Sequence, residues 1–251
     1  MGVEELLASL ARVEAEREAR ARDAALGRAV VSLKAFQQGR LALTYPDLLV
    51  HPRWAGAARF FLDELYGPSD FSERDRGLGR VVPTLVRLFP VEVVQTVDRL
   101  LRLHAVSEEL DSAMARAGLQ AESSGGGDRP LAFGPVMWAG DLYGEVWRRV
   151  DRRADREEQV RTVVDIGQQL DRLTRLPGLR QSLRLMRLPA SVAGLGALQG
   201  FLERGFDAFR AMDGAAGFLA TIETRESLWL DWLFDSRPRG AHDPVWLGQF
   251  P

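Results

Sequence analysis

The sequence lacks cysteine and is poor in lysine and histidine. Without a thiol, the chain can form neither a disulfide framework nor a thiolate metal site, and it cannot use a cysteine nucleophile. Lys34 is the only lysine among many arginines, which either a GC-rich coding bias or a use of guanidinium groups for bidentate pairing would explain. His51, His104 and His242 are the only histidines that could act as bases or ligands.

Long apolar runs and a strong charge of one sign are also missing. No run approaches the roughly 20 apolar residues of a membrane-spanning helix, so we expect no transmembrane segment. Glu4 and Glu5 stand where a secretory signal peptide would carry positive charge, which favours a cytoplasmic protein. A formal net charge of -2 gives no positive field for a phosphate backbone, and we expect no nucleic-acid partner.

The motifs of familiar enzymes are not found either. The sequence contains no Gly-x-Ser-x-Gly elbow, no His-Glu-x-x-His zinc helix and no set of kinase motifs. No glycine-rich loop joins a strand to a helix in the manner of a phosphate-binding site. We therefore assign no catalytic residue, and the sequence favours a non-catalytic protein.

What the sequence does contain is helical periodicity over almost its whole length. We predict an all-α protein, an irregular multi-helix bundle of about eight or nine helices with a long N-terminal helix. Residues 1–38 are expected to form that long charged helix, residues 39–239 the bundle, and residues 240–251 a tail that is docked or mobile. Pro83 should kink or interrupt a helix, and Pro177 and Pro189 should fall between helices. A flexible loop over 119–130, rich in Gly and Ser, lies within the bundle or separates two domains.

One predicted helix, from Pro90 to about Arg116 and ended by Gly118, carries polar groups on its apolar face. At 100° per residue, His104 falls near the centre of that face, Asp111 beside it and Glu108 towards one edge. Side chains spaced in this way project towards the same neighbouring helix. If the face is buried, each of them must find a polar partner or destabilise the fold.

Three interpretations of this group remain open. In the first, His104 and Asp111 belong to a structural network with an arginine or backbone group of another helix. In the second, His104, Glu108 and Asp111 form a ligand site in which His104 binds a metal or the iron of haem. In the third, His104 is an acid–base catalyst. A ferritin-type dinuclear site is disfavoured because the sequence has no Glu-x-x-His.

Two further groups are candidate binding residues. Gly140 and Gly144 lie four apart on a predicted aromatic-rich helix, where missing side chains allow either close helix crossing or a flat ligand against the backbone. Arg180, Arg184 and Arg187 share one face of a short helix. They form a solvated face paired with acids, an anion or acidic-partner site, or a short membrane-surface stripe.

Three stretches resemble a known group of sequences. Residues 59–71 read RFFLDELYGPSDF and are followed by Arg74 and Asp75; residues 103–111 and the pair 182–187 and 205–210 accompany them. These stretches resemble an uncharacterised bacterial family with the signature RFFLxELYGPxDF, over most of the chain after about Gln38. The resemblance implies an all-helical bacterial protein and supplies no activity and no catalytic residue.

From the residues themselves we expect a non-catalytic cytoplasmic binding or protein-interaction module. Its charged N-terminal helix and aromatic tail favour a homo-oligomer or a partner protein. The alternative is a haem- or metal-binding helical protein with a globin-like pocket, by analogy alone, that uses His104. No cofactor is identified, and haem is the one considered.

Overall fold

The computed structural model describes residues 2–64, 72–88, 91–124, 136, 138–236, 240 and 242–251. The described part contains helices and no strand, which confirms the all-α class. The helices are α1 (Val3–Arg22), α2 (Ala24–Thr44), α3 (Pro46–Val50), α4 (Ala55–Glu64), α5 (Ser72–Leu88), α6 (Val91–Ser124), α7 (Gly140–Val150), α8 (Arg153–Leu173), α9 (Leu179–Leu185), α10 (Arg187–Val192), α11 (Gly196–Ala211) and α12 (Ala216–Asp235).

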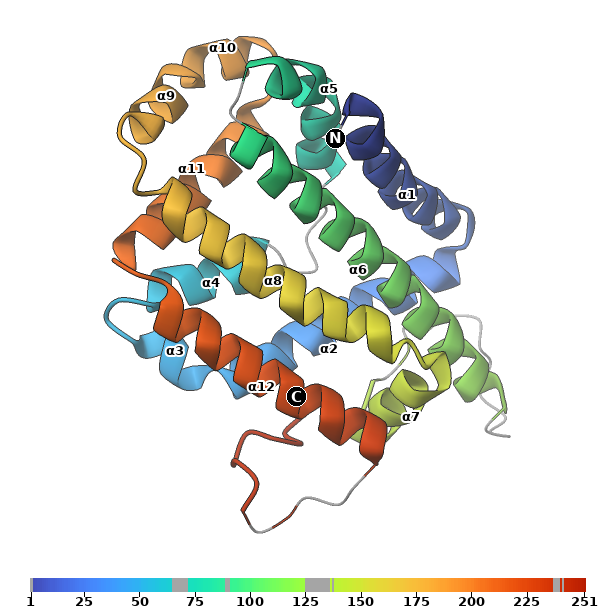
Figure 1. Cartoon of the computed structure of the whole chain (residues 1–251). Helices are drawn as coiled ribbons and strands as arrows, with labels where there is room; N and C mark the ends of the chain where they lie inside the picture. Colours follow the sequence, from blue (N-terminus) through green and yellow to red (C-terminus); the bar gives the residue numbers. More distant parts are fainter. Residues whose placement is uncertain are drawn as a thin grey trace.

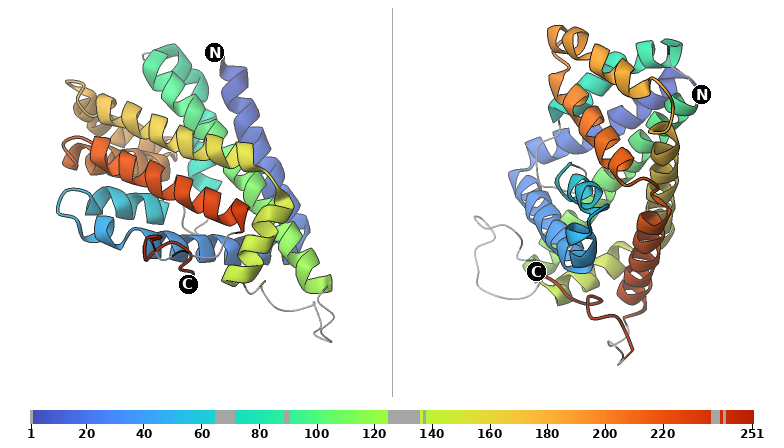
Figure 2. Two further views of the ribbon diagram at one scale, coloured as in Figure 1. Left: turned by 60° about the horizontal axis from the view of Figure 1, so that its bottom comes forward. Right: turned by 90° about the vertical axis from the view of Figure 1, so that its left-hand side faces the viewer.

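The long helix α6 is the centre of the arrangement. It packs against α1, α2, α7 and α8, and α8 packs in turn against α12. In Figure 1, α6, α8 and α12 lie side by side in front, with α2, α4 and α11 behind them. The turned views in Figure 2 show α9 and α10 at one end of the molecule, next to α5. Because α6 has neighbours on several sides, polar groups on it can be covered by more than one helix.

The long N-terminal helix is present, but it ends at Arg22 rather than near residue 38. Asp23 is extended (φ -121°, ψ 98°), and its side chain accepts hydrogen bonds from the backbone N–H groups of Ala25 and Leu26. This is the geometry of an N-cap, which satisfies the free donors at the start of a new helix. The charged run from residue 14 to residue 23 therefore ends one helix and begins the next.

The number of helices exceeds the eight or nine expected, for local reasons of this kind. In addition to the break at Asp23, the chain forms the short helix α3, and a turn at Met186 separates α9 from α10. Pro83 does not interrupt α5, and Pro189 lies in the first turn of α10, where a missing backbone N–H costs nothing. The breaks at Asp23 and Met186 and the short helix α3 increase the number of helices, and none of these features changes the fold class.

The loop expected over 119–130 begins later than predicted. Residues 119–124 belong to α6, and residues 125–130 lie outside the described residues. Gly118 is inside the helix, where a Cβ would lie 2.7 Å from Cη2 of Trp138. The glycine therefore makes room for a tryptophan instead of ending the helix. Residues 65–71 of the family signature also lie outside the described part.

The core consists of four groups of buried apolar side chains. The largest aromatic group lies between α2, α7 and α12 and contains Phe36, Tyr143 and Trp229. The tail completes it, since Leu247 is fully buried there and Phe250 packs against it. The tail, which the sequence left as docked or mobile, is docked.

Candidate functional site

The helix α6 brings Glu108 and Asp111 into the interior, as the wheel predicts. Both residues are buried, whereas His104, one turn earlier, is half-buried. His104 and Glu108 are four residues apart on α6, so their side chains project from the same face of the helix. Of the three candidate residues, Glu108 and Asp111 face the N-terminal helices.

The partners of these acids are cations from α1 and α2. Nη1 of Arg20 lies 2.5 Å from Oε2 of Glu108, and Nζ of Lys34 lies 2.5 Å from Oε1 of the same carboxylate. Lys34 Nζ is also 3.9 Å from Oδ2 of Asp111. Arg20 donates further hydrogen bonds to the Glu108 carbonyl and to Oγ of Ser112, both at 3.2 Å. We call Arg20, Lys34, Glu108 and Asp111 the buried ion cluster.

The two carboxylates respond to this environment in opposite directions. Burial alone would raise the pKa of Glu108, but the charges of Lys34 and Arg20 lower it to about 2. Burial raises the pKa of Asp111; Lys34 offsets part of this effect and the negative charge of Glu108 adds to it. Glu108 is therefore the firmly ionised member, and Asp111 is the acid that the interior favours in its neutral form.

A second set of polar side chains lies beyond Asp111. Arg40 is buried and forms a bidentate pair with Glu226, at 2.9 and 3.2 Å. Arg156 is also buried; its guanidinium lies 4.1 Å from the ring centre of Trp147, and burial lowers its pKa. Tyr143 lies between them, and burial raises its pKa. The interior thus holds the buried ion cluster and the Arg40–Glu226 pair, which is the geometry of a structural network. Arg156 donates to Gln159 but pairs with no acid among the described residues, and its Nη2 is buried without a hydrogen bond.

The arrangement does not fit a metal ion. Glu108 is already bonded to two cations, and a metal would have to displace Arg20 and Lys34. In the part of the chain that the structure describes, no three His, Asp or Glu side chains converge as metal ligands. Nothing in this geometry favours haem ligation by His104, which stays a prediction. Of the other histidines, His51 stacks on Trp54 with ring centres 4.0 Å apart, and His242 is exposed in the tail.

The space beside Gly140 and Gly144 is filled by side chains of this chain. A Cβ on Gly140 would lie 2.5 Å from Cδ2 of Phe250, and one on Gly144 would lie 3.2 Å from Nη1 of Arg148. Arg148 donates to the carbonyl of Leu233 on α12. Both glycines therefore serve close packing in this structure, and neither faces an open space that a flat ligand would fill.

The three candidate arginines are divided between α9 and α10. Arg180 pairs with Asp207 at 2.8 Å, and Arg187 pairs with Glu203 at 2.7 Å; both acids are on α11. Arg184 is exposed and has no ionic partner among the described residues. An anion would thus meet one free guanidinium here instead of three.

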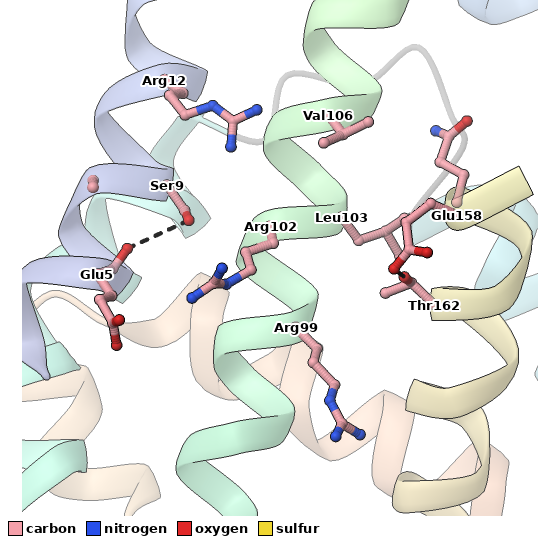
Figure 3. Close-up of a pocket in the computed structure, with 11 residues that line it drawn as sticks. Glu5, Ser9, Arg12, Arg99, Arg102, Leu103, Val106, Glu158 and Thr162 are labelled. Carbon is pink, nitrogen blue, oxygen red and sulfur yellow. Dashed lines mark hydrogen bonds between the residues drawn. The ribbon is translucent and has the colours of Figure 1, made fainter. Parts of the chain in front are cut away.

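Two surface grooves have volumes of about 510 and 500 Å³. The first lies along α6, between α1 and α8. Figure 3 shows Arg12 pointing from α1 towards α6 and Arg102 pointing from α6 towards Glu5. Arg12 is held by Glu109 and Arg102 by Asp98, so their charges are already neutralised. The second groove, between α4 and α11, is lined by two segments of the family resemblance, and its Arg204 pairs with Glu64. Arg99 in the first groove and both Arg59 and Asp63 in the second have no ionic partner among the described residues, so these grooves offer isolated charges and no converging pair.

Sequence reasoning missed the cations of the buried ion cluster. Arg20 lies in a run of charges that reads as a solvated surface, and a single helix wheel cannot say which helix covers Glu108. One signal was available in Lys34, because it departs from the use of arginine everywhere else. A compact ammonium on a flexible stem can reach two carboxylates that a planar guanidinium fork would fit less well.

Comparisons with known proteins give a family but no activity. No curated protein and no solved structure matches the chain. A family described as a domain of unknown function (DUF8198) matches residues 16–240. The match is consistent with the resemblance to an uncharacterised family. It starts at residue 16, whereas the resemblance seen in the sequence starts near Gln38. The chain belongs to the family of the domain of unknown function DUF8198.

Proposed function

We propose that this protein is a non-catalytic cytoplasmic interaction module that associates with a second copy of itself. A bacterial origin, which the sequence resemblance implies, is part of the same proposal. The observation that carries it is a group of large apolar side chains exposed at the end of the molecule. This group, the apolar corner, consists of Leu185, Met186, Leu188 and Val192 on and between α9 and α10.

The apolar corner is exposed to an unusual degree. The exposed fractions are 73% for Leu185, 74% for Leu188 and 83% for Val192, within eight residues of sequence. The largest group of exposed apolar side chains on a folded domain is often its interaction site. Figure 1 shows α9 and α10 at the edge of the molecule, where a partner can reach them.

The charges around the corner favour an apolar partner over an acidic surface. Residues 172–202 contain five arginines and no acid. Arg175, Arg180 and Arg187 are paired with acids at 171, 207 and 203, and Arg172 and Arg184 have no ionic partner among the described residues. Stable binding to anionic lipid draws on several free basic groups beside the apolar ones. With Arg184 as the unpaired arginine of α9, the corner resembles the apolar centre of a protein interface.

We assign a second copy as the partner because an identical corner offers a matching set of exposed apolar side chains. Other large exposed apolar side chains, such as Val31, Val50, Val91 and Val245, are on separate elements. Two corners that meet about a two-fold axis bury the same side chains on both chains. With a polar rim, such a contact falls within the size of ordinary weak dimers.

Sedimentation of the full chain over a wide concentration range tests the proposal. Wild type should reversibly form a dimer, and Leu188→Glu with Val192→Glu should weaken it by at least about tenfold. Val50→Glu is the matched control, because Val50 is 78% exposed on α3, and its dimer should be unchanged. A wild type that stays monomeric throughout, or one that sediments with anionic vesicles as a monomer, would overturn the proposal.

A further inference from the structure

The tail segment, residues 242–251, packs on one face of the bundle by means of side chains. The ring of Phe250 lies 5.7 Å from Phe36, 5.9 Å from Tyr143, 5.3 Å from Trp229 and 5.9 Å from Trp232, measured between ring centres. These four rings come from α2, α7 and α12 and, with Gly39 and Gly140, form what we call the tail-docking face. Figure 2 shows the segment crossing from α12 to α2.

Two glycines of this face are shaped to the segment. A Cβ on Gly140 would lie 2.5 Å from the ring of Phe250, and a Cβ on Gly39 would lie 2.9 Å from Cβ and Cγ of Pro251. Any larger residue would enter the volume that the segment occupies. The face thus accommodates the Phe250 ring in the space beside Gly140 and Pro251 in the space beside Gly39.

The segment holds its own conformation. Its backbone hydrogen bonds run from Leu247 N–H to the Pro244 carbonyl and from Gln249 N–H to the Trp246 carbonyl, at 3.0 and 3.2 Å. Among the described residues, no hydrogen bond connects 245–251 to the helices. Contact is made by the apolar side chains and by Arg225, whose guanidinium lies 5.5 Å from the Trp246 ring. A locally folded segment that docks through side chains has the properties of a short binding motif.

From these contacts we infer that the tail-docking face is a peptide-binding site for a Leu-x-x-Phe-Pro segment that forms local turns, and that it accepts the tail segment of a second copy in place of its own. The inference concerns a different surface from the apolar corner and does not depend on it. Exchange of an identical segment between chains adds no new contact type, and the high local concentration of the attached segment opposes it. Lowering the affinity of the attached segment therefore opens the face to a free one.

Binding of a labelled peptide to the full chain tests the inference. The probe is a fluorescent peptide with the sequence of residues 242–251, measured by anisotropy. Phe250→Ala in the full chain empties the position of the Phe250 ring. This variant should bind the peptide at least about tenfold more tightly than wild type, because the tail segment of the wild type competes for the same face. A peptide with alanine in place of its phenylalanine should bind at least about tenfold more weakly. Adding Gly140→Val to Phe250→Ala fills the space beside Gly140 and should abolish binding.

A folded Phe250→Ala chain that ignores the peptide, or that binds both peptides equally, overturns the inference. Equal binding after Gly140→Val does the same. If circular dichroism shows that Phe250→Ala does not fold, the measurement moves to wild type with excess unlabelled peptide. Displacement should then speed hydrogen exchange at the amides of Leu247 and Gln249, and unchanged exchange at a large excess rejects the site.

Discussion

Replacing Glu108 with glutamine tests the buried ion cluster directly, because the amide keeps the shape of the side chain and removes its charge. In the wild type, the carboxylate lies 2.5 Å from both Arg20 Nη1 and Lys34 Nζ. The substitution leaves these two cations with Asp111 as the remaining acid of the cluster, 3.9 Å from Lys34. Breaking a buried ion pair on one side leaves charge uncompensated and is strongly destabilising.

The magnitude follows from the pKa of Glu108. It is about 2 in the folded protein, against an ordinary value of 4.5. At about 1.4 kcal/mol per pKa unit, ionisation of this carboxyl stabilises the fold by about 3 kcal/mol. The side chain is 6% exposed, so solvent screens little of this energy. We expect Glu108→Gln to lower the free energy of unfolding by about 3 kcal/mol at neutral pH.

The effect has a defined dependence on pH. A carboxyl whose pKa folding lowers stabilises the native state above its unfolded pKa, and this stability is lost as the pH falls through the folded pKa. The difference between wild type and Glu108→Gln should therefore be full at neutral pH and shrink as the pH falls from 4.5 to about 2. Urea unfolding followed by far-ultraviolet circular dichroism at a series of pH values measures it.

Asp111→Asn is the matched control for this experiment. The interior already favours the neutral form of Asp111, because burial raises its pKa, so removing its charge should cost less than removing that of Glu108. A loss for Glu108→Gln below about 1 kcal/mol, which is typical of an ordinary substitution, would refute the reasoning. A loss that stays constant down to acidic pH would refute the assignment of charge.

Three further predictions concern packing and capping. Gly167→Ala puts a Cβ 2.4 Å from Cδ2 of Leu219 and should lower the free energy of unfolding by about 1–3 kcal/mol. A Cβ at Gly56 would have no atom within 4 Å, so Gly56→Ala should raise the free energy of unfolding by about 0.5–1 kcal/mol. Thermal melts that rank the two variants the other way would contradict the packing. Asp23→Ala removes the N-cap of α2 and should cost about 1 kcal/mol in urea unfolding, while Asp23→Asn should stay near wild type. Phe250→Ala should lower the free energy of unfolding by about 3–4 kcal/mol and shift tryptophan emission to longer wavelength. An unchanged emission spectrum would place the Phe250 ring outside the core.

The class of fold was predictable from the sequence because apolar periodicity is a local property. Helix ends were less so. Asp23 reads as one more charge in a polar run, and its capping role depends on the conformation that it adopts. Gly118 reads as a stop signal, yet Trp138 covers it from a distant part of the chain. Such tertiary contacts override local preferences and are invisible in a window of residues.

Of the buried ion cluster, the acids were predictable from the sequence and the cations were not. The wheel placed His104 near the centre of the inward face, Asp111 beside it and Glu108 towards one edge. In the structure Asp111 and Glu108 are buried, whereas His104 is half-buried. The wheel could not identify Arg20 and Lys34 as partners of the two acids, since those residues precede the acids by more than 70 positions. A face of one helix specifies that a partner is required, and only the packing of the other helices specifies which residue supplies it.

Docking of residues 242–251 has a consequence for how the chain matures during synthesis. The rings of Phe36 and Tyr143 leave the ribosome well before Phe250 is added, at about 5–20 residues per second. Until residues 247–250 follow, the growing polypeptide presents an aromatic surface that Leu247 and Phe250 do not yet cover. This half of the molecule therefore reaches its final packing only after residue 250 has left the ribosome, and until then the uncovered rings favour aggregation.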